Sequence, residues 1–353
     1  MNKEEAKKYA VNLLKELIRI PSFSREEKMA ADLIQSALVN LGYKVERKFN
    51  NVWTCGVKRK DFPTILLNSH IDTVKPGSGW SGDPFIPKQL KGKIYGLGSN
   101  DAGASVVALM AVYMLMEKED IPFNLIYAAT AEEEISGKNG VESILNDAGK
   151  IDLGIVGEPT GMNLAIAEKG LMVLDCVASG KRSHAASSTG INSIYKATED
   201  IERIRNFKFP EKSKLLDEVT MQVTVINSGE AHNIIPESCS FVVDVRSNDC
   251  YSNREIFDIL CRHLKSDIKS RSFRLNSSSI DPNHPIVRIA KKTGIQCCGS
   301  GTLSDQALMP FPTVKIGPGD PLRSHTADEF IMTREIYDGI DIYMNLLTNL
   351  KLK

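Results

Sequence analysis

The sequence lacks the features that mark several large classes of protein. No stretch of about 18 or more consecutive apolar residues occurs in its 353 residues, so no transmembrane helix is predicted. The first 20 residues mix Lys with Glu and lack the basic-then-apolar order of a signal peptide. Lys plus Arg and Asp plus Glu each number 44, so the formal net charge is zero. This balance provides no electrostatic signal for nucleic acid or an anionic membrane, and neither is expected as a partner.

Cysteines are few and scattered. There are seven, an odd number, with no Cys-x-x-Cys pair, and the adjacent Cys297 and Cys298 do not have metal-ligand spacing. We therefore expect the cysteines to be packing residues and the protein to lie in a reducing, cytoplasmic compartment.

The composition is that of a globular protein, with 42% hydrophobic and 25% charged residues, and the length suggests two domains. Continuous apolar runs at 64–67, 123–129 and 151–156 indicate strands buried on both faces. Helical patterns alternate with these runs, which predicts an α/β domain with a mixed, mostly parallel sheet flanked by helices. One of these helices is expected to open at a capping box, Ser24-Arg-Glu-Glu27.

The middle of the chain has a different pattern. Half-exposed strands and two helices follow in the order strand-helix-strand-strand-helix-strand, typical of an α+β ferredoxin-like sandwich. The α/β pattern returns near Pro285. We predict one α/β domain formed by residues 1–168 and 281–353, interrupted by an inserted domain at 169–280.

Polar residues follow the apolar runs of the first domain. His70 and Asp72 follow the first run, Glu132–Glu134 the second and Glu158 the third, while Asp101 opens a helix. Ligands of open parallel sheets bind at the carboxyl ends of the strands. A lone histidine after a strand is more often a hydrogen-bonded loop residue, and a Glu triplet is more often the solvated start of a helix. Together they form a His/carboxylate set that suits zinc or a pair of divalent cations.

Five motifs in this order resemble the co-catalytic zinc deacylases and peptidases, a family that includes acetylornithine deacetylase, succinyl-diaminopimelate desuccinylase, aminoacylase and carboxypeptidase G. The motifs are His70-Ile-Asp72-Thr-Val, Gly98-Ser-Asn-Asp101-Ala-Gly, Thr130-Ala-Glu-Glu-Glu134, Gly157-Glu158-Pro-Thr and Ser324-His325-Thr326. The resemblance spans essentially the whole chain.

The resemblance implies two Zn²⁺ ions, with Co²⁺ able to substitute, in the domain of residues 1–168 and 281–353. Its implied ligands are His70 and Glu158 for one ion, Glu134 and His325 for the other, and Asp101 as the bridge, with a cis bond from Asp101 to Ala102. Asp72 would orient His70, and Glu133 would be the general base. The family's usual Asp-Glu-Glu is Glu132-Glu133-Glu134 here. It therefore stays open whether the base and the ligand are Glu133 and Glu134 or Glu132 and Glu133.

In the insert, the resemblance implies that His184 reaches across a homodimer interface to the substrate carbonyl oxygen. It also implies substrate-binding roles for Asn233 and for Arg246, whose bidentate fork suits a carboxylate. The insert would then act as a lid and dimerisation domain. Taken alone, a histidine such as His184 is more often a surface-loop residue.

The implied activity is the hydrolysis of an N-acyl amino acid, a small-molecule substrate, by a metal-activated water with Glu133 as base. N-acetylornithine, N-acetylcitrulline or N-succinylornithine in arginine biosynthesis are the leading substrates. Succinyl-diaminopimelate desuccinylase in lysine biosynthesis and a dipeptidase or aminopeptidase are alternatives. A non-enzymatic scaffold is disfavoured because every matched metal position carries a suitable residue.

Overall fold

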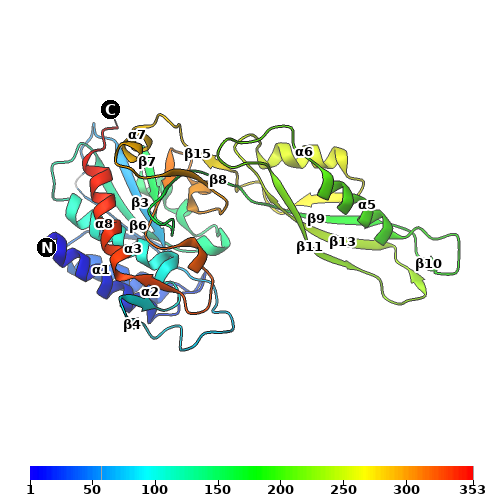
Figure 1. Cartoon of the computed structure of the whole chain (residues 1–353), viewed down its shortest axis with the longest axis horizontal. Helices are drawn as coiled ribbons and strands as arrows, with labels where there is room; N and C mark the ends of the chain where they lie inside the picture. Colours follow the sequence, from blue (N-terminus) through cyan, green and yellow to red (C-terminus); the bar gives the residue numbers. More distant parts are fainter. Residues whose placement is uncertain (57, 353) are drawn as a thin grey trace. The chain divides into compact units, whose positions relative to one another are not determined.

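The computed structural model in Figure 1 describes residues 1–56 and 58–352. The chain forms two compact units. The first comprises Met1–Ile166, Ile280–Cys298 and Ser304–Lys353, and the second comprises Ala167–Ser279 and Gly299–Leu303. Every residue expected to hold a metal lies in the first unit.

The first unit is built on a mixed sheet with the strand order β1-β2-β6-β3-β7-β17-β8; the sheet continues from β8 to β15, a strand of the second unit, and β16 also pairs with β8. The strands are β1 (Val45–Lys48), β2 (Asn51–Cys55), β3 (Thr64–His70), β6 (Asn124–Thr130), β7 (Leu153–Val156), β8 (Leu164–Glu168), β15 (Ser278–Ser279), β16 (Cys297–Ser300) and β17 (Thr313–Lys315). The four central strands β6, β3, β7 and β17 are parallel. All residues of β3, β6 and β7 are buried, as their continuous apolar runs predict.

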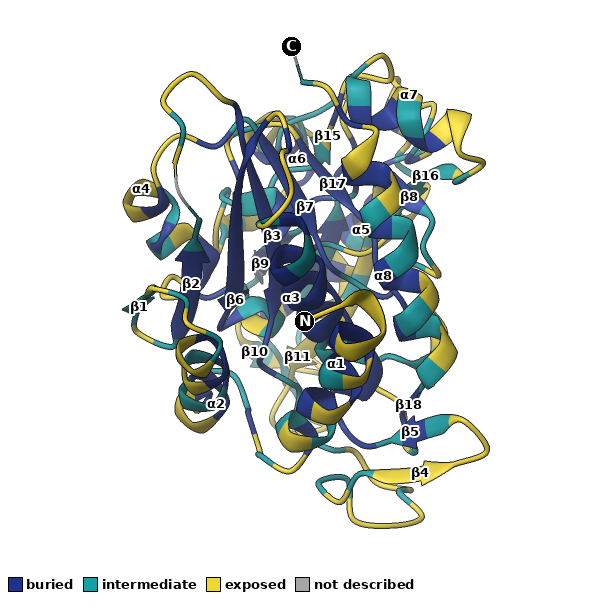
Figure 2. Cartoon of the chain, turned by 90° about the vertical axis from the view of Figure 1, so that its left-hand side faces the viewer, coloured by how far each residue is buried: buried dark blue, intermediate teal, exposed yellow. Residues whose placement is uncertain are grey.

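Helices cover both faces of this sheet. They are α1 (Lys3–Ile18), α2 (Lys28–Asn40), α3 (Ala104–Met116), α4 (Leu145–Ala148), α7 (Pro285–Lys292) and α8 (Thr333–Thr348). Figure 2 shows β3, β6, β7 and α3 buried, with α1 and α8 exposing their outer sides. The window Ser99–Met116 is long and apolar enough to span a membrane, but 89% of it is buried inside the protein. It is therefore a core helix, and the fold confirms the α/β prediction.

A small sheet in the same unit joins two segments that prove important for the site. Its order is β18-β5-β4, formed by β18 (Phe330–Met332), β5 (Lys93–Tyr95) and β4 (Lys88–Leu90). The short helical turns η1 (Ser99–Gly103), η2 (Glu133–Ile135), η3 (Val141–Ser143), η4 (Asp305–Leu308) and η5 (Pro321–Arg323) complete the unit.

The predicted capping box at Ser24 is wrong. Helix α2 begins at Lys28, and its N-cap, Glu27, makes no side-chain capping bond. The Ser24 hydroxyl instead donates to the Asp72 carboxylate at 2.8 Å. As a cap, the Ser24 oxygen would accept from helix N–H groups; here its O–H instead donates to a buried carboxylate, and such a charge-assisted bond is stronger than a neutral one.

The second unit is the antiparallel α+β sandwich that the sequence predicts. Its order is β11-β13-β9-β14, formed by β9 (Met172–Ser179), β11 (Thr220–Ser228), β13 (Ser238–Arg246) and β14 (Asp267–Ser270). Helices α5 (Ser193–Asn206) and α6 (Asn253–His263) pack on it around a buried apolar cluster. This order with two crossover helices is ferredoxin-like. A separate ladder pairs β10 (Ser183–His184) with β12 (Ile234–Ile235).

Candidate metal centre and active site

The parallel order of the central strands gathers the predicted site residues. His70 ends β3, Glu158 follows β7, and Glu132–Glu134 follow β6. Because β6, β3 and β7 are parallel neighbours, their carboxyl ends meet at one edge of the sheet.

Two groups of possible metal ligands share one carboxylate. His70, Asp101 and Glu158 form one group, and Asp101, Glu134 and His325 form the other. In each group the ligand atoms lie within 4.8 Å of one another. Asp101 Oδ1 lies 3.2 Å from His70 Nε2, and Asp101 Oδ2 lies 3.6 Å from His325 Nε2. Asp101 is thus placed to bridge two cations.

The His70 ring is held in the tautomer that a metal requires. Its Nδ1 lies 2.8 Å from the backbone carbonyl of Asp72. A carbonyl can only accept, so Nδ1 carries a proton, and Nε2 is the nitrogen that faces Asp101 and Glu158. The Asp72 carboxylate is farther from the ring, at 3.5 Å. The nearer contact that orients His70 therefore comes from the Asp72 backbone.

The backbone around Asp101 is unusual. The bond from Asp101 to Ala102 is cis, as the resemblance implied. Gly98, which precedes the turn η1, has a φ of 72°, and a Cβ there would lie 2.6 Å from the side chain of Thr73. Only glycine fits this position without displacing a neighbour.

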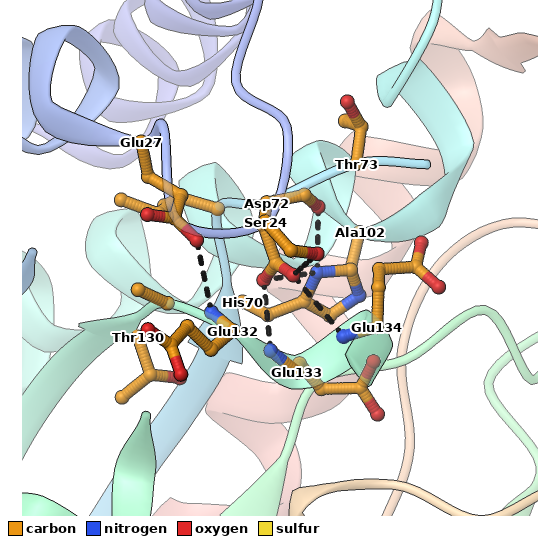
Figure 3. Close-up of polar contacts among 12 residues, drawn as sticks. Ser24, Glu27, His70, Asp72, Thr73, Ala102, Thr130, Glu132, Glu133 and Glu134 are labelled. Carbon is orange, nitrogen blue, oxygen red and sulfur yellow. Dashed lines mark hydrogen bonds and ion pairs between the residues drawn. The ribbon is translucent and has the colours of Figure 1, made fainter. Parts of the chain in front are cut away.

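The side chains of the three consecutive glutamates point in different directions (Figure 3). The Asp72 carboxylate accepts the backbone N–H groups of Glu133 and Glu134 at 3.0 and 3.1 Å. The Glu134 carboxylate reaches His325 Nε2 at 3.0 Å. The Glu132 side chain instead accepts from the backbone and side-chain amides of Asn139. Glu134, and not Glu132, therefore joins the ligand cluster.

Burial and mutual repulsion raise the pKa values of two acids in the cluster, Glu158 and Glu133. Burial raises the pKa of Glu158 to about 8, with repulsion from Asp101 adding to the shift. Burial also raises the pKa of Glu133 well above its usual range, and the carboxylates of Glu158 and Asp305 contribute. A concentration of buried carboxylates held protonated in this way is an environment that a divalent cation would neutralise.

The pKa values of the two histidines, His70 and His325, are raised as well. Burial disfavours the charged form of His70, but Glu158 and the neighbouring aspartates outweigh it, so its pKa lies well above the usual value. The hydrogen bond to Glu134 raises the pKa of His325 to about 9. Both rings thus hold a proton where a cation would bind.

One orphaned atom supports the fit to a metal. Among the described residues, Glu158 Oε1 is buried and has no hydrogen-bond partner, although His70 Nε2 is 3.7 Å away. An unsatisfied buried carboxylate oxygen is costly unless another ligand completes it. Histidine nitrogens and carboxylate oxygens at this spacing suit zinc and related divalent cations.

Sequence reasoning did not assign two buried acids that support the site. Asp305 accepts from Asn68 and Thr130 at 2.8 and 3.0 Å, which ties it to the ends of β3 and β6. Glu329 accepts from the backbone N–H groups of Asn100 and Asp101. No local pattern marks either acid, because both contact segments more than 170 residues away in the sequence.

The predicted site residues of the second unit lie at two ends of its sheet. His184 is exposed in β10, and the Asn233 carbonyl accepts the N–H of Ala185 next to it. Arg246 ends β13 and forms a forked ion pair with Asp244 at 2.7 and 3.1 Å. The structure brings His184 and Asn233 together, but not Arg246.

Comparison with known proteins adds to this geometry. A model of peptidase family M20/M25/M40 matches residues 66–349, well over half of the chain. The chain belongs to this family. Members of the M20/M25/M40 family are metal-dependent, so the chain is a metal-dependent hydrolase acting on amide bonds, with candidate ligands for a dinuclear site.

The relatives of this M20-family chain include two deacylases. Succinyl-diaminopimelate desuccinylase from Orientia tsutsugamushi (strain Boryong) is 27% identical, with 97% of this chain and 96% of the relative covered. Acetylornithine deacetylase from Proteus mirabilis (strain HI4320) is also 27% identical, with 91% of each covered. A solved tripeptidase from Staphylococcus aureus has a TM-score of 0.79 at 20% identity, covering 97% and 98% of the two chains. This last likeness is one of fold.

Proposed function

We propose that the protein is a zinc-dependent amidohydrolase that removes the acyl group from an N-acyl amino acid. The observation that carries the proposal is the single carboxylate of Asp101 shared by two His/carboxylate groups, with Glu133 on the turn beside them. His70, Asp101 and Glu158 would hold one zinc, and Asp101, Glu134 and His325 the other. Co²⁺ is expected to substitute for zinc.

Each side chain then has one task. Two bound cations would supply a water of lowered pKa and positive charge for the carbonyl oxygen of the amide. Glu133 would take a proton from the attacking water and pass it to the leaving amine, and burial raises the pKa of its carboxyl, which favours holding that proton in between. Asp72 holds the turn that carries Glu133 and Glu134 through their backbone N–H groups.

For the substrate, we propose N-acetylornithine or a close analogue, N-acetylcitrulline or N-succinylornithine, in arginine biosynthesis. This is supported by the likeness to acetylornithine deacetylase over 91% of the chain. Succinyl-diaminopimelate is the second candidate, supported by the equally similar desuccinylase. In both reactions an amide between an acyl group and an amino acid is cut.

We further propose that the first unit is the catalytic domain and that the second is a lid through which two copies form a homodimer. Strand β11 is at the edge of its sheet and exposes Val225 and Ile226 at 46% and 51%. Ile194 and Tyr195 of the packed helix α5 are exposed as well. An apolar edge strand is suited to pairing with its own copy.

The homodimer is also supported by the arrangement of His184. Residues 238–246 of β13 span roughly 25 Å at about 3.3 Å per residue, and His184 lies beyond the end opposite Arg246. One copy of the unit therefore does not readily offer both residues to one substrate. A cytoplasmic location is proposed from the seven unpaired cysteines.

The test is a substrate panel with zinc or cobalt supplied, followed by release of free amine. The panel holds N-acetylornithine, N-acetylcitrulline, N-succinylornithine, N-succinyl-diaminopimelate and several dipeptides. We expect one acylated amino acid to exceed all dipeptides at least a hundredfold in kcat/KM. Preference for succinyl-diaminopimelate would select the second candidate. Preference for dipeptides, or no turnover with two metals bound, would reject the deacylase proposal.

A further inference from the structure

Glu329 lies four residues after His325 and is 1% exposed. Its carboxylate accepts three backbone N–H groups from the segment that leads into the shared ligand Asp101. Oε1 accepts from Asn100 at 2.7 Å and from Asp101 itself at 3.0 Å, and Oε2 accepts from Gly98 at 3.1 Å. One side chain thus satisfies three neighbouring amides of a loop that has no regular ladder of its own.

Other bonds join the same two segments. The backbone carbonyl of Glu329 accepts the N–H of Gly96 at 3.0 Å. The Asn100 side chain both donates to the Asp320 carbonyl and accepts from the Asp320 N–H, each at 3.1 Å. The contact is so close that a Cβ at Gly319 would lie 2.4 Å from Asn100 Oδ1.

We propose that Glu329 is a positioning residue that fixes Asp101 relative to the segment carrying His325, and so sets the spacing of the Asp101, Glu134 and His325 group. The inference rests on the proposed two-metal function. No local sequence signal marks Glu329 for this task, because Asp328-Glu329 has the appearance of a solvated acidic turn.

The two ligand groups depend on Glu329 to different extents. His70 and Glu158 come from β3 and from the residues after β7, and the sheet holds these neighbours together. His325 is on a loop, has a φ of 58°, and its side chain is 51% exposed. Its separation from Asp101 is set by the bonds between residues 96–101 and 320–329. Loss of the Glu329 acceptors is therefore expected to weaken the His325 group selectively.

The experiment titrates metal-free full-length protein with Zn²⁺ by calorimetry and records kcat and the melting temperature. Glu329→Gln keeps the shape of the side chain but replaces one acceptor oxygen with a donor facing an N–H. The matched control is Glu335→Gln. Glu335 is in the same stretch and caps α8 through Met332 N while pairing with Arg323, without touching the Asp101 loop.

We expect Glu329→Gln to weaken the second zinc at least tenfold, to change the first less than threefold, and to lower kcat with the weaker site. The melting temperature of the zinc-free protein should match that of Glu335→Gln, which should retain both affinities. Unchanged zinc affinities in Glu329→Gln, or an equal loss at both sites, would overturn the inference. An equal loss would indicate a merely structural role.

Should Glu329→Gln fail to fold, Asn100→Ser tests the same connection from the other segment, because it removes the bonds to Asp320. It must then show the selective loss, and retention of both affinities overturns the inference. Failure of the proposed function is distinguishable. Wild-type protein that binds two zinc ions but hydrolyses no acylated amino acid rejects the function alone, whereas an active wild type with an indistinguishable Glu329→Gln rejects only this inference.

Discussion

The Asp72 carboxylate accepts the backbone N–H of Glu133 at 3.0 Å and thereby fixes the start of the turn that carries the proposed base. Its second oxygen accepts from Glu134 N–H and from the Ser24 hydroxyl. Asp72 also orients His70 through its backbone carbonyl. One buried residue therefore aligns two proposed ligands, His70 and Glu134, and the proposed base, Glu133.

Replacing Asp72 by Ala should impair both stability and turnover. Two part-buried N–H groups lose their acceptor, at about 1–3 kcal/mol each, so urea unfolding should show a loss of about 2–6 kcal/mol. We expect kcat/KM to fall at least a hundredfold because the base and ligand lose their alignment. Ser24→Ala is the control, since it removes a single hydrogen bond worth about 1 kcal/mol. Near-normal activity of Asp72→Ala would contradict the alignment.

Glu133→Gln should abolish turnover while two metals remain bound, since general base catalysis contributes about 10²–10⁴-fold. Glu132→Gln is the informative companion, because Glu132 contacts Asn139 rather than the ligand cluster. This variant should lower the melting temperature but leave kcat close to that of the wild type. Activity of Glu133→Gln within tenfold of wild type, with Glu132→Gln inactive but stable, would reverse the two roles.

The metal-free protein should become less stable as pH rises from about 5 to 8. Folding raises the pKa of Glu158 to about 8 and that of His70 well above 6.5, so the folded state binds more protons than the unfolded state in this range. The lowered pKa of Asp72 and Asp101 acts only below about 4, where stability falls with falling pH.

Zinc should flatten this dependence, because it replaces the bound protons. Melting temperatures of metal-free and zinc-loaded protein across this pH range check the slope. Calorimetric zinc titration in buffers of different ionisation enthalpy checks the release of protons at pH 7. A metal-free melting temperature that rises from pH 5 to 8 would show that the acids are not held protonated.

His184→Ala should lower kcat at least tenfold with little loss of metal, if the ring contacts the substrate carbonyl oxygen. His263→Ala is the control, since that ring, at the end of α6, packs on Phe207 after α5, with ring centroids 4.6 Å apart. An unchanged rate for His184→Ala would return His184 to the role of an exposed loop residue.

The proposed dimer can be disrupted at its edge strand. Ile226→Glu places a charge on β11 and should convert the protein to a monomer in light scattering, with activity falling in parallel if His184 acts in the partner's site. Val39→Glu in α2 is the matched control, because Val39 is similarly exposed at 53%. A monomeric wild type, or a dimeric Ile226→Glu, would argue against this interface.

Patterns that depend on neighbours in the chain were readable in advance. The runs at 64–67, 123–129 and 151–156 identify β3, β6 and β7, because a strand buried on both faces must be apolar throughout. The capping box at Ser24 shows where such reading fails. The motif is present, but the Ser24 hydroxyl donates to the carboxylate of Asp72, which is 48 residues away in the chain.

The sequence by itself determined the order of the main helices and strands, the α/β unit with its ferredoxin-like insertion, and which residue types follow the buried strands, because burial periodicity and motif spacing are local properties. Only the tertiary structure decided which of three adjacent glutamates joins the ligands, that the carboxylate of Asp72 supports a turn, and that Glu329 holds the Asp101 loop. These outcomes depend on hydrogen bonds between segments up to 231 residues apart. Such bonds form only when packing removes water from the groups concerned, and no local pattern encodes them.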